Sequence, residues 1–364
     1  MKISVGFDAH AADGRVTGLG VYVRHLVEAL KKTAGSEFDL HFYKRKKAGK
    51  DLSTPARLGW ENFELPQLAA RDQVRLLHVP AFAPPLLKKI PLVVTVHDLI
   101  GMLFRNQLGT ASALYWGKWL PFVVRKADIL IADSQHTRRD LVVHLGVSEK
   151  KIRVIYPGVP DRFAPAVPEV GFKAVQSRLS IRGPYFLFVG TLEPRKNLKR
   201  TLEAFRLFLN TIREPERFHL VIVGSRDFAH GQFFRELSKE LSFQPNQILF
   251  TGYLEHEELN ALYTRALAFV YPSLYEGFGF PVLEAMASGA PVLTSNTTSI
   301  PEVAGDAALQ VDPLNVVEIS EAMKRLAEDE PTRQGLIRKG FERIIHFSWK
   351  KTAEQTLNVY RELL

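Results

Sequence analysis

Short apolar runs alternate with amphipathic segments along most of the chain. In the first half, runs rich in β-branched and aromatic residues predict strands at residues 2–8, 37–43, 75–79, 92–97, 128–133 and 152–156. Apolar positions that recur every three or four residues predict helices at residues 20–32, 109–126 and 135–145. Strands of this kind, alternating with helices, indicate a parallel sheet that is covered on both faces.

The same alternation begins again after a stretch rich in Pro and Gly at residues 157–168, which is typical of a linker. Further strands are predicted at residues 185–190, 219–224, 247–251, 266–271, 291–294 and 308–311. Further helices are predicted at residues 198–211, 232–243, 256–266, 281–288, 316–329, 332–346 and 350–363.

The pattern therefore predicts an α/β protein of two Rossmann-like, doubly wound domains, at residues 1–168 and 169–349. We expect the last helix, residues 350–364, to pack back on the first domain. Two such domains in tandem are expected to hold their ligand in a cleft between them, beyond the carboxyl ends of the strands.

Composition is that of a soluble globular protein, and it excludes several kinds of site. Of the 364 residues, 46% are apolar and none is cysteine, which excludes disulfides, thiolate metal sites and cysteine nucleophiles. No apolar run reaches the roughly 18 residues needed to cross a bilayer, and the N-terminus does not look like a signal peptide. We expect a cytoplasmic protein.

The net charge of +9 lies in the first half of the chain. Residues 1–170 contain 25 Lys and Arg against 16 Asp and Glu, whereas residues 171–364 contain 23 of each. A basic half could face nucleic acid, an anionic lipid surface or a phosphorylated substrate. No zinc-finger spacing or aromatic RNA-binding motif is present, so nucleic acid is not expected.

One stretch late in the chain, residues 271–302, combines glycines with carboxylates where a predicted strand meets a helix. Gly277 and Gly279 stand at the start of that helix, with Glu276 before them and Glu284 within it. Glycines let a ligand approach the backbone, and a helix N-terminus attracts an anion. Incidental glutamates near a helix start are the alternative, but a carboxylate beside an anion site favours a ligand with hydroxyls next to its phosphates, such as a nucleotide sugar.

The residues from Glu276 to Glu284, EGFGFPVLE, resemble the E-x7-E signature of the retaining glycosyltransferases of family GT4, which have the GT-B fold. The following residues, ASGAPVLTSNTTSIPEVAGDAALQVDP, are similar as well, and the resemblance covers nearly the whole chain. It implies that Glu276 contacts hydroxyls of the transferred sugar and that Glu284 contacts the nucleotide ribose. The resemblance also implies that backbone groups of four residues hold the sugar or diphosphate, namely Gly277, Phe278, Gly279 and Phe280.

A basic loop follows the first strand of the second half, in the sequence GTLEPRKN. Arg195 and Lys196 could bind a diphosphate and stabilise charge on the leaving group, although a solvated basic turn is the alternative. By resemblance the loop supplies an Arg and a Lys to the phosphates, and Lys196 matches by position. The Arg usually follows the glycine directly, where Thr191 stands here, so Arg195 is the substitute.

Two further candidates lie in the first half. Gly18 and Gly20 precede a helix, but the third glycine and the acidic residue of a dinucleotide fingerprint are missing, which argues against a nicotinamide enzyme. The resemblance implies that this loop approaches the donor phosphates and the acceptor. His97 ends a buried strand, where it could cap the strand, and the resemblance implies that it reaches the donor sugar.

Residues 99–127 contain no acidic residue, but they contain Arg105, Lys118, Arg125 and Lys126 together with aromatic residues that include Tyr115, Trp116, Trp119 and Phe122. Such a segment could lie against an anionic membrane, or it could pack on its own sheet. Both alternatives stay open, and a peripheral position at the inner face of the membrane is one of them.

We therefore predict a hexosyltransferase of polysaccharide biosynthesis that retains configuration at the anomeric carbon and resembles bacterial mannosyltransferases. The expected donor is GDP-mannose, the acceptor a glycan or lipid-linked sugar, and no cofactor is expected. No D-x-D motif or metal-ligand cluster stands out, so we expect no metal. The alternatives are a UDP-glucose or other UDP-sugar transferase, a sugar-nucleotide epimerase and a non-catalytic nucleotide-sugar binding protein.

Overall fold

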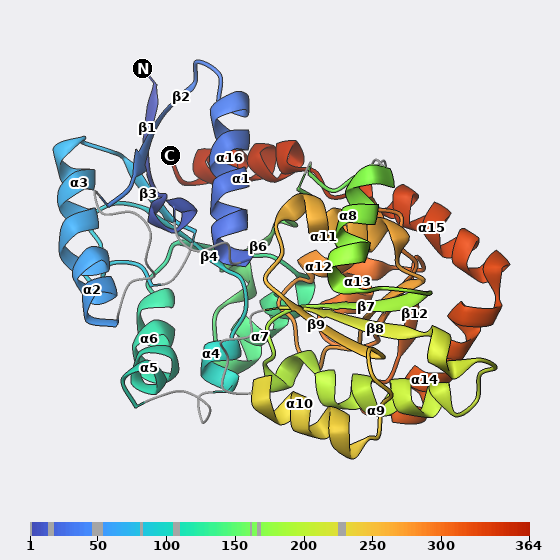
Figure 1. Ribbon diagram of the computed structural model, residues 1–364. Helices are drawn as coiled ribbons and strands as arrows, with labels where there is room; N and C mark the ends of the chain where they lie inside the picture. Colours follow the sequence, from blue (N-terminus) through green and yellow to red (C-terminus); the bar gives the residue numbers. More distant parts are fainter. Residues whose placement is uncertain are drawn as a thin grey trace. The chain divides into compact units, whose positions relative to one another are not determined.

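The computed structural model of the protein describes residues 2–13, 18–45, 54–80, 83–104, 110–160, 162–165, 169–224 and 231–364. The chain divides into two compact units (Figure 1), of which unit 1 is Met1–Gly158 with Phe347–Leu364 and unit 2 is Val159–His346. The predicted boundary at residue 168 falls within the range of unit 2. The C-terminal helix α16 (Trp349–Leu363) belongs to unit 1, where it packs against α1 (Gly18–Thr33).

The described part of unit 1 contains a six-stranded parallel sheet in the order β2-β1-β3-β4-β5-β6. The strands are β1 (Ile3–Asp8), β2 (Phe38–Tyr43), β3 (Leu76–Val79), β4 (Leu92–Val96), β5 (Ile129–Ala132) and β6 (Ile152–Val154). Their apolar residues are buried because helices cover the sheet. The chain runs to one side of β1 first and then to the other, so the direction of winding reverses between β1 and β3.

The described part of unit 2 contains a second parallel sheet, in the order β12-β11-β10-β7-β8-β9. Its strands are β7 (Tyr185–Val189), β8 (His219–Val223), β9 (Ile248–Gly252), β10 (Ala268–Tyr271), β11 (Val292–Ser295) and β12 (Leu309–Val311). This is the order of the dinucleotide-binding Rossmann fold, in which winding reverses between the first and fourth strands, here β7 and β10. The predicted α/β class with two Rossmann-like domains is confirmed.

Helices accompany both sheets (Figure 1). Unit 1 also has α2 (Thr54–Gly59), α3 (Leu65–Arg71), α4 (Ile100–Leu103), α5 (Thr110–Leu114), α6 (Leu120–Val124) and α7 (Gln135–Leu145). Unit 2 has α8 (Glu169–Leu179), α9 (Leu198–Leu209), α10 (Gly231–Glu240), α11 (His256–Arg265), α12 (Phe280–Ala287), α13 (Ile300–Ala304), α14 (Val316–Glu328) and α15 (Glu330–Ile344). Among the described residues, no helix is long and apolar enough to cross a membrane.

The structure differs from the predicted pattern in its short and irregular helices. The helix expected at residues 109–126, whose first residue lies outside the described residues, is α5, a π-helical segment η4 (Tyr115–Trp119) and α6. Pro121, which has no N–H to donate, stands in the first turn of α6 and marks this break. A second π-helical segment, η2 (Trp60–Glu64), joins α2 to α3, none of which the periodicity predicts.

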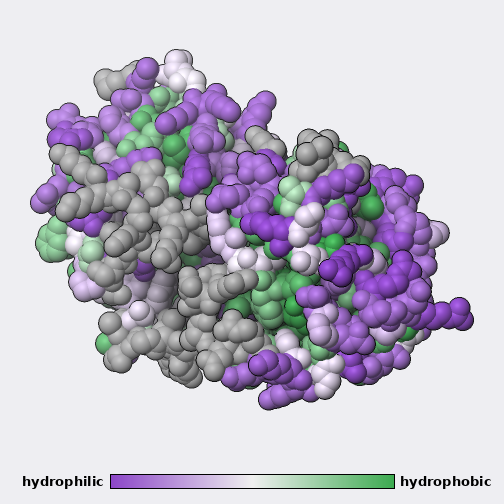
Figure 2. All heavy atoms as spheres, in the orientation of Figure 1, coloured by the Kyte–Doolittle hydropathy of each residue, from purple (hydrophilic) through white to green (hydrophobic). Residues whose placement is uncertain are grey.

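The surface is mostly hydrophilic on the face that Figure 2 shows, with apolar residues between the polar ones. Each unit has its own apolar core. In unit 1 one core joins the sheet to residues of α3, α6 and α7, and in unit 2 one core joins the sheet to residues of α9 and α14. The cores hold the strand ends, and therefore the loops that follow them, in fixed positions.

Candidate functional site

The candidate site of unit 2 lies where the winding of the sheet reverses. β7 and β10 are hydrogen-bonded neighbours, and the loops that follow them leave the same edge of the sheet. The loop after β7 contains the short 3-10 helix η6 (Pro194–Lys196), and the loop after β10 contains Glu276. Ligands of doubly wound sheets bind at such a reversal, so this is where unit 2 is expected to bind one.

Hydrogen bonds join these two loops to each other. The N–H of Leu274 donates to the carbonyl oxygen of Arg195 at 2.7 Å, and the side-chain amide of Asn197 donates to the carbonyl oxygen of Pro272 at 2.9 Å. Asn197 has φ of 62°, a left-handed conformation that asparagine tolerates better than most residues. The loops therefore present Arg195, Lys196 and Glu276 from one connected framework.

The carboxylate of Glu276 is the centre of a buried cluster and is only 7% exposed. Its Oε1 atom lies 2.7 Å from each of three donors, which are Lys196 Nζ, Ser273 Oγ and Tyr271 Oη. Nη1 of Arg195 lies 3.2 Å from both carboxylate oxygens. Lys196 also contacts the hydroxyl of Tyr271. The structure thus brings Arg195, Lys196 and Glu276 together.

Electrostatics keep the Glu276 carboxylate ionised. Burial alone would raise its pKa, but the charges of Lys196 and Arg195 and the hydrogen bonds that it accepts lower the pKa to about 2. Burial lowers the pKa of the Lys196 ammonium, and the charge of Glu276 opposes that effect. The site therefore holds two cations and an anion away from water, where each charge has a large effect on the others.

The glycine-marked turn after Glu276 leads directly into α12. Gly279 has φ of 120°, and a Cβ atom at this position would lie 2.8 Å from Cδ1 of Ile300, so only glycine fits. The hydroxyl of Ser299 lies 2.9 Å from the carbonyl oxygen of Glu276 and 2.8 Å from that of Phe278. Gly277 and Phe278 are buried, and the Phe280 ring packs edge-on against Phe278.

Glu284 lies further along α12 with partners of its own. Oη of Tyr263 lies 3.5 Å from its Oε2 atom. Burial raises the pKa of Glu284 to about 7, and the charge of Arg162 opposes this rise. The two glutamates of the E-x7-E signature thus differ in their chemistry, since one is a firmly ionised carboxylate and the other titrates near neutral pH.

The remaining predicted residues belong to unit 1. Gly18 and Gly20 lie in the first turn of α1, where Gly18 is exposed and Gly20 is buried, and residues 14–17 before them lie outside the described residues. A Cβ atom on Gly18 would have no described heavy atom within 4 Å, so packing does not explain glycine there.

His97 follows β4 and has a partner at each ring nitrogen. Nδ1 donates to Oδ2 of Asp133 at 2.5 Å, and Nε2 donates to the carbonyl oxygen of Pro80 at 2.7 Å. Both partners accept hydrogen bonds, so the ring is a doubly protonated imidazolium. Burial lowers the pKa of His97, but the charge of Asp133 and both hydrogen bonds outweigh it and raise the pKa overall. Both hydrogen bonds therefore favour the protonated form of His97.

Sequence reasoning missed the side chains that hold the predicted ones. Tyr271 ends β10, and Ser273 follows two residues later in the same stretch as Glu276. A tyrosine at the end of an apolar run predicts a core residue, so its hydrogen bond to Glu276 is not expected from the sequence. Asp133 directly precedes the cap of α7, where Ser134 accepts the N–H of Thr137 at 3.0 Å, so the sequence around it indicates only a helix start. In the described residues no cluster of three His, Cys, Asp or Glu side chains could hold a metal ion.

Comparison with known proteins supports the same interpretation. Residues 173–343 match the family described as "Glycosyl transferases group 1", and residues 16–163 match "Glycosyltransferase Family 4". O-antigen chain mannosyltransferase B of Escherichia coli is 32% identical over 272 residues, which span 74% of this chain and 70% of that protein. The serotype-specific mannosyltransferase WbdA of E. coli is 30% identical over 278 residues, 75% of this chain but 33% of WbdA.

Solved structures agree on the fold. The sucrose-phosphate synthase of Thermosynechococcus elongatus has a TM-score of 0.76 at 21% identity, covering 100% of this chain and 99% of that one. The predicted GT-B fold and the predicted enzyme class, a glycosyltransferase of the hexosyltransferase type, are confirmed. With a relative at 32% identity matched over most of its length, and with both halves matched to glycosyltransferase families, the chain belongs to the GT4 glycosyltransferases.

Proposed function

We propose that this glycosyltransferase transfers a hexose, with mannose from GDP-mannose as the favoured donor, to a glycan or lipid-linked acceptor. The observation that carries the proposal is the buried cluster of Glu276, Arg195 and Lys196 at the winding reversal of unit 2. Two cations suit a diphosphate, and an ionised carboxylate suits the hydroxyls of a sugar. The names of the E. coli relatives, which are mannosyltransferases, support mannose as the sugar.

In the proposed reaction Glu276 accepts hydrogen bonds from hydroxyls of the donor sugar. Arg195 and Lys196 are paired with Glu276 in the structure. In the proposed reaction both also interact with the diphosphate and stabilise its negative charge as it leaves. The bond from the anomeric carbon to the phosphate oxygen breaks as a bond to the acceptor oxygen forms on the same face. The proton of the acceptor hydroxyl passes to the leaving phosphate, so GDP is released and configuration is retained.

Glu284 is proposed to accept a hydrogen bond from a ribose hydroxyl, and the backbone of Gly277, Phe278, Gly279 and Phe280 to hold the sugar or diphosphate. The positive end of the helix dipole of α12, which begins at Phe280, supports this role. His97, Gly18 and Gly20 are proposed to act from unit 1, His97 as a cation. No cofactor or metal is part of this proposal.

A thermal-shift screen tests the donor. GDP-mannose and GDP should raise the melting temperature, because at a hundred times Kd a ligand stabilises the folded state by about 2.7 kcal/mol. GMP, which lacks the second phosphate, should have a smaller effect, and EDTA should not change the rate of mannose transfer. Stabilisation by UDP-glucose or UDP-GlcNAc without any by GDP-mannose would reassign the donor. No response to any nucleotide sugar would refute the proposal.

We also propose that the enzyme works at the cytoplasmic face of an anionic membrane, in contact through α5, η4 and α6. Tyr115 is buried, but Leu114 is 53% exposed and Phe122 is 51% exposed, with Nζ of Lys126 4.9 Å from the centre of the Phe122 ring. Phosphatidylglycerol vesicles should sediment the protein at low salt and release it at about 0.5 M salt. Phe122→Ser should weaken sedimentation, and no sedimentation at low salt would contradict this contact.

A further inference from the structure

The loop that follows β11, residues 296–299, lies against the main chain of Glu276 in unit 2. β11 pairs with β10 in parallel, so this loop and the loop that contains Glu276 leave the same edge of the sheet. The loop leads into α13, which packs against α12 (Figure 1). The predicted site residues include none of the side chains of this loop.

Two hydroxyls of the loop hold the backbone groups of Glu276. The hydroxyl oxygen of Thr298 accepts a hydrogen bond from the N–H of Glu276 at 3.3 Å. The hydroxyl of Ser299 donates to the carbonyl oxygen of Glu276 at 2.9 Å. These contacts hold the two planar peptide groups on either side of the Glu276 Cα atom. The loop therefore sets the direction in which the Glu276 side chain leaves the backbone.

Thr298 stands in a turn position that suits glycine. The N–H of Ile300 lies 3.3 Å from the carbonyl oxygen of Thr297, which closes a four-residue turn. In this turn Thr298 has φ of 59°, whereas Ser299 has φ of −81° and ψ of −14°. A positive φ at the first central position alone is the pattern of a type II′ turn, where glycine is the usual residue.

The side chain of Thr298 makes this conformation costly for the fold. Left-handed backbone is a genuine outlier for a β-branched residue, because the branched side chain crowds the backbone. Among the described non-glycine residues with positive φ, Thr298 is the one with a β-branched side chain. Residues strained in this way cluster at functional sites, and this one is hydrogen-bonded to Glu276.

We propose that Thr298 is a positioning residue for sugar transfer, whose hydroxyl holds the Glu276 main chain so that the carboxylate meets the donor sugar in one orientation. This inference rests on the proposed function of Glu276. Glycine would form the turn without strain, but it has no hydroxyl to accept the Glu276 N–H. The strain is therefore retained for the hydroxyl, because a small misplacement of a group at a reaction centre lowers the rate by a large factor.

The experiment compares Thr298→Gly with Thr298→Ser in the full chain. Serine keeps the hydroxyl, whereas glycine removes both the hydroxyl and the strain. In Thr298→Gly we expect kcat for sugar transfer to fall by about tenfold to a hundredfold, as for a small misplacement. In Thr298→Ser we expect kcat to stay close to the wild-type value. The Kd of GDP should be unchanged in both variants, because GDP lacks the sugar that Glu276 is proposed to bind.

Stability separates this role from a structural one, and Ser180→Gly is the matched control. Ser180 is exposed and has φ of 56°, but it stands before the amino end of β7, whereas Glu276 follows the carboxyl end of β10. Glycine suits a positive φ, so neither glycine variant should melt below the wild type. Ser180→Gly should keep the wild-type kcat. A loss of kcat in Thr298→Gly that only follows a loss of folded protein overturns the proposal.

Hydrogen exchange followed by mass spectrometry tests the contact without a substrate. Peptides that contain Glu276 should exchange faster in Thr298→Gly than in the wild type or in Thr298→Ser, because the acceptor of its N–H is gone. If exchange changes in this way but the wild type transfers no sugar, the proposed function fails and the positioning of Glu276 by Thr298 stands. If transfer proceeds with the same kcat in Thr298→Gly, the positioning role alone fails. Unchanged exchange, or a Thr298→Ser variant as slow as Thr298→Gly, also overturns it.

Discussion

Replacing Glu276 with glutamine should lower kcat/KM for sugar transfer by about a thousandfold, while the nucleoside diphosphate still binds. The expected loss is of the size seen when one oriented polar group is removed from a buried reaction centre. Glutamine keeps the shape of glutamate, but it removes the charge that Lys196 and Arg195 now share. Steady-state kinetics with GDP-mannose, and titration with GDP, measure the two effects separately.

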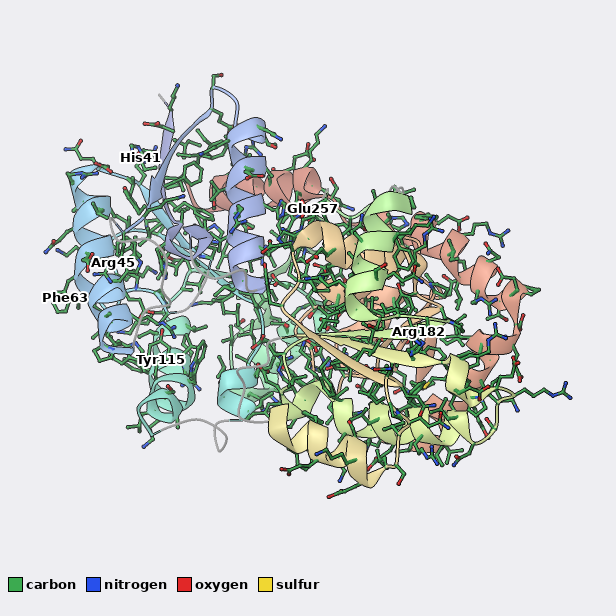
Figure 3. All side chains as sticks on the ribbon, in the orientation of Figure 1. His41, Arg45, Phe63, Tyr115, Arg182 and Glu257 are labelled. Atoms are coloured by element: carbon green, nitrogen blue, oxygen red, sulfur yellow. The ribbon has the colours of Figure 1, made fainter. Side chains whose placement is uncertain are left out.

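The control is Glu257→Gln, since Glu257 is an exposed glutamate of α11 in the same unit (Figure 3). Ser273→Ala is the graded variant, because it removes one donor to the Glu276 carboxylate and leaves its charge. We expect wild-type rates for Glu257→Gln and an intermediate rate for Ser273→Ala. Because the pKa of Glu276 is about 2, the wild type keeps this charge at every practical assay pH, and acid should not mimic the variant. Near-normal transfer by Glu276→Gln would refute its assignment to the sugar.

The parts of this fold that the sequence predicts well are those with strong periodicity. The strands that end at Val189 and Tyr271 are continuous apolar runs, and the loops that follow them contain Lys196 and Glu276, which meet in the site. Glu276 can be predicted from its place before a glycine-marked helix start and from the E-x7-E resemblance, and Lys196 from its match by position to the basic loop of GT4 glycosyltransferases. Their meeting follows from the sheet order, which places β7 beside β10.

What the sequence does not predict depends on contacts between distant residues. Glu61 and Tyr115 are 54 positions apart, and each lies in a π-helical segment that has no simple periodic signature. Nothing in the stretch around Trp60 indicates that its indole is hydrogen-bonded to Asp8, 52 residues earlier. From the sequence alone, Glu61 is expected to be an ordinary surface glutamate. In the structure it is buried inside the unit, where Tyr115 of η4 donates a hydrogen bond to it.

Replacing Lys196 with methionine should lower the free energy of unfolding by about 3–5 kcal/mol. The variant leaves the Glu276 carboxylate buried with only one of its two cationic partners, Arg195. GDP affinity should fall about tenfold or more, since one of two phosphate-directed cations is gone. The matched control is Lys199→Met, an exposed lysine of α9 whose contact with Glu203 is a surface pair. Urea unfolding followed by circular dichroism measures the stability of the whole chain.

Fluorescence shows which unit unfolds, because all four tryptophans, Trp60, Trp116, Trp119 and Trp349, belong to unit 1. A transition seen in the circular dichroism signal but not in the fluorescence therefore belongs to unit 2. In Lys196→Met we expect that transition to move to lower urea while the fluorescence transition stays in place. A shift of the fluorescence transition alone would contradict the assignment of Lys196 to the buried pair.

The double variant Lys196→Met/Glu276→Gln separates the cost of an unpaired charge from the loss of chemistry. With both charges removed no buried ion lacks its partner, so most of the lost stability should return. Transfer should stay as low as in Glu276→Gln alone, since the carboxylate is still missing. Recovery of stability without recovery of activity would mean that the ion pair is kept for the reaction and not for the fold. A double variant as unstable as Lys196→Met would instead mean that Lys196 stabilises unit 2 through its packing against Tyr271, whose ring centre lies 5.0 Å from Nζ.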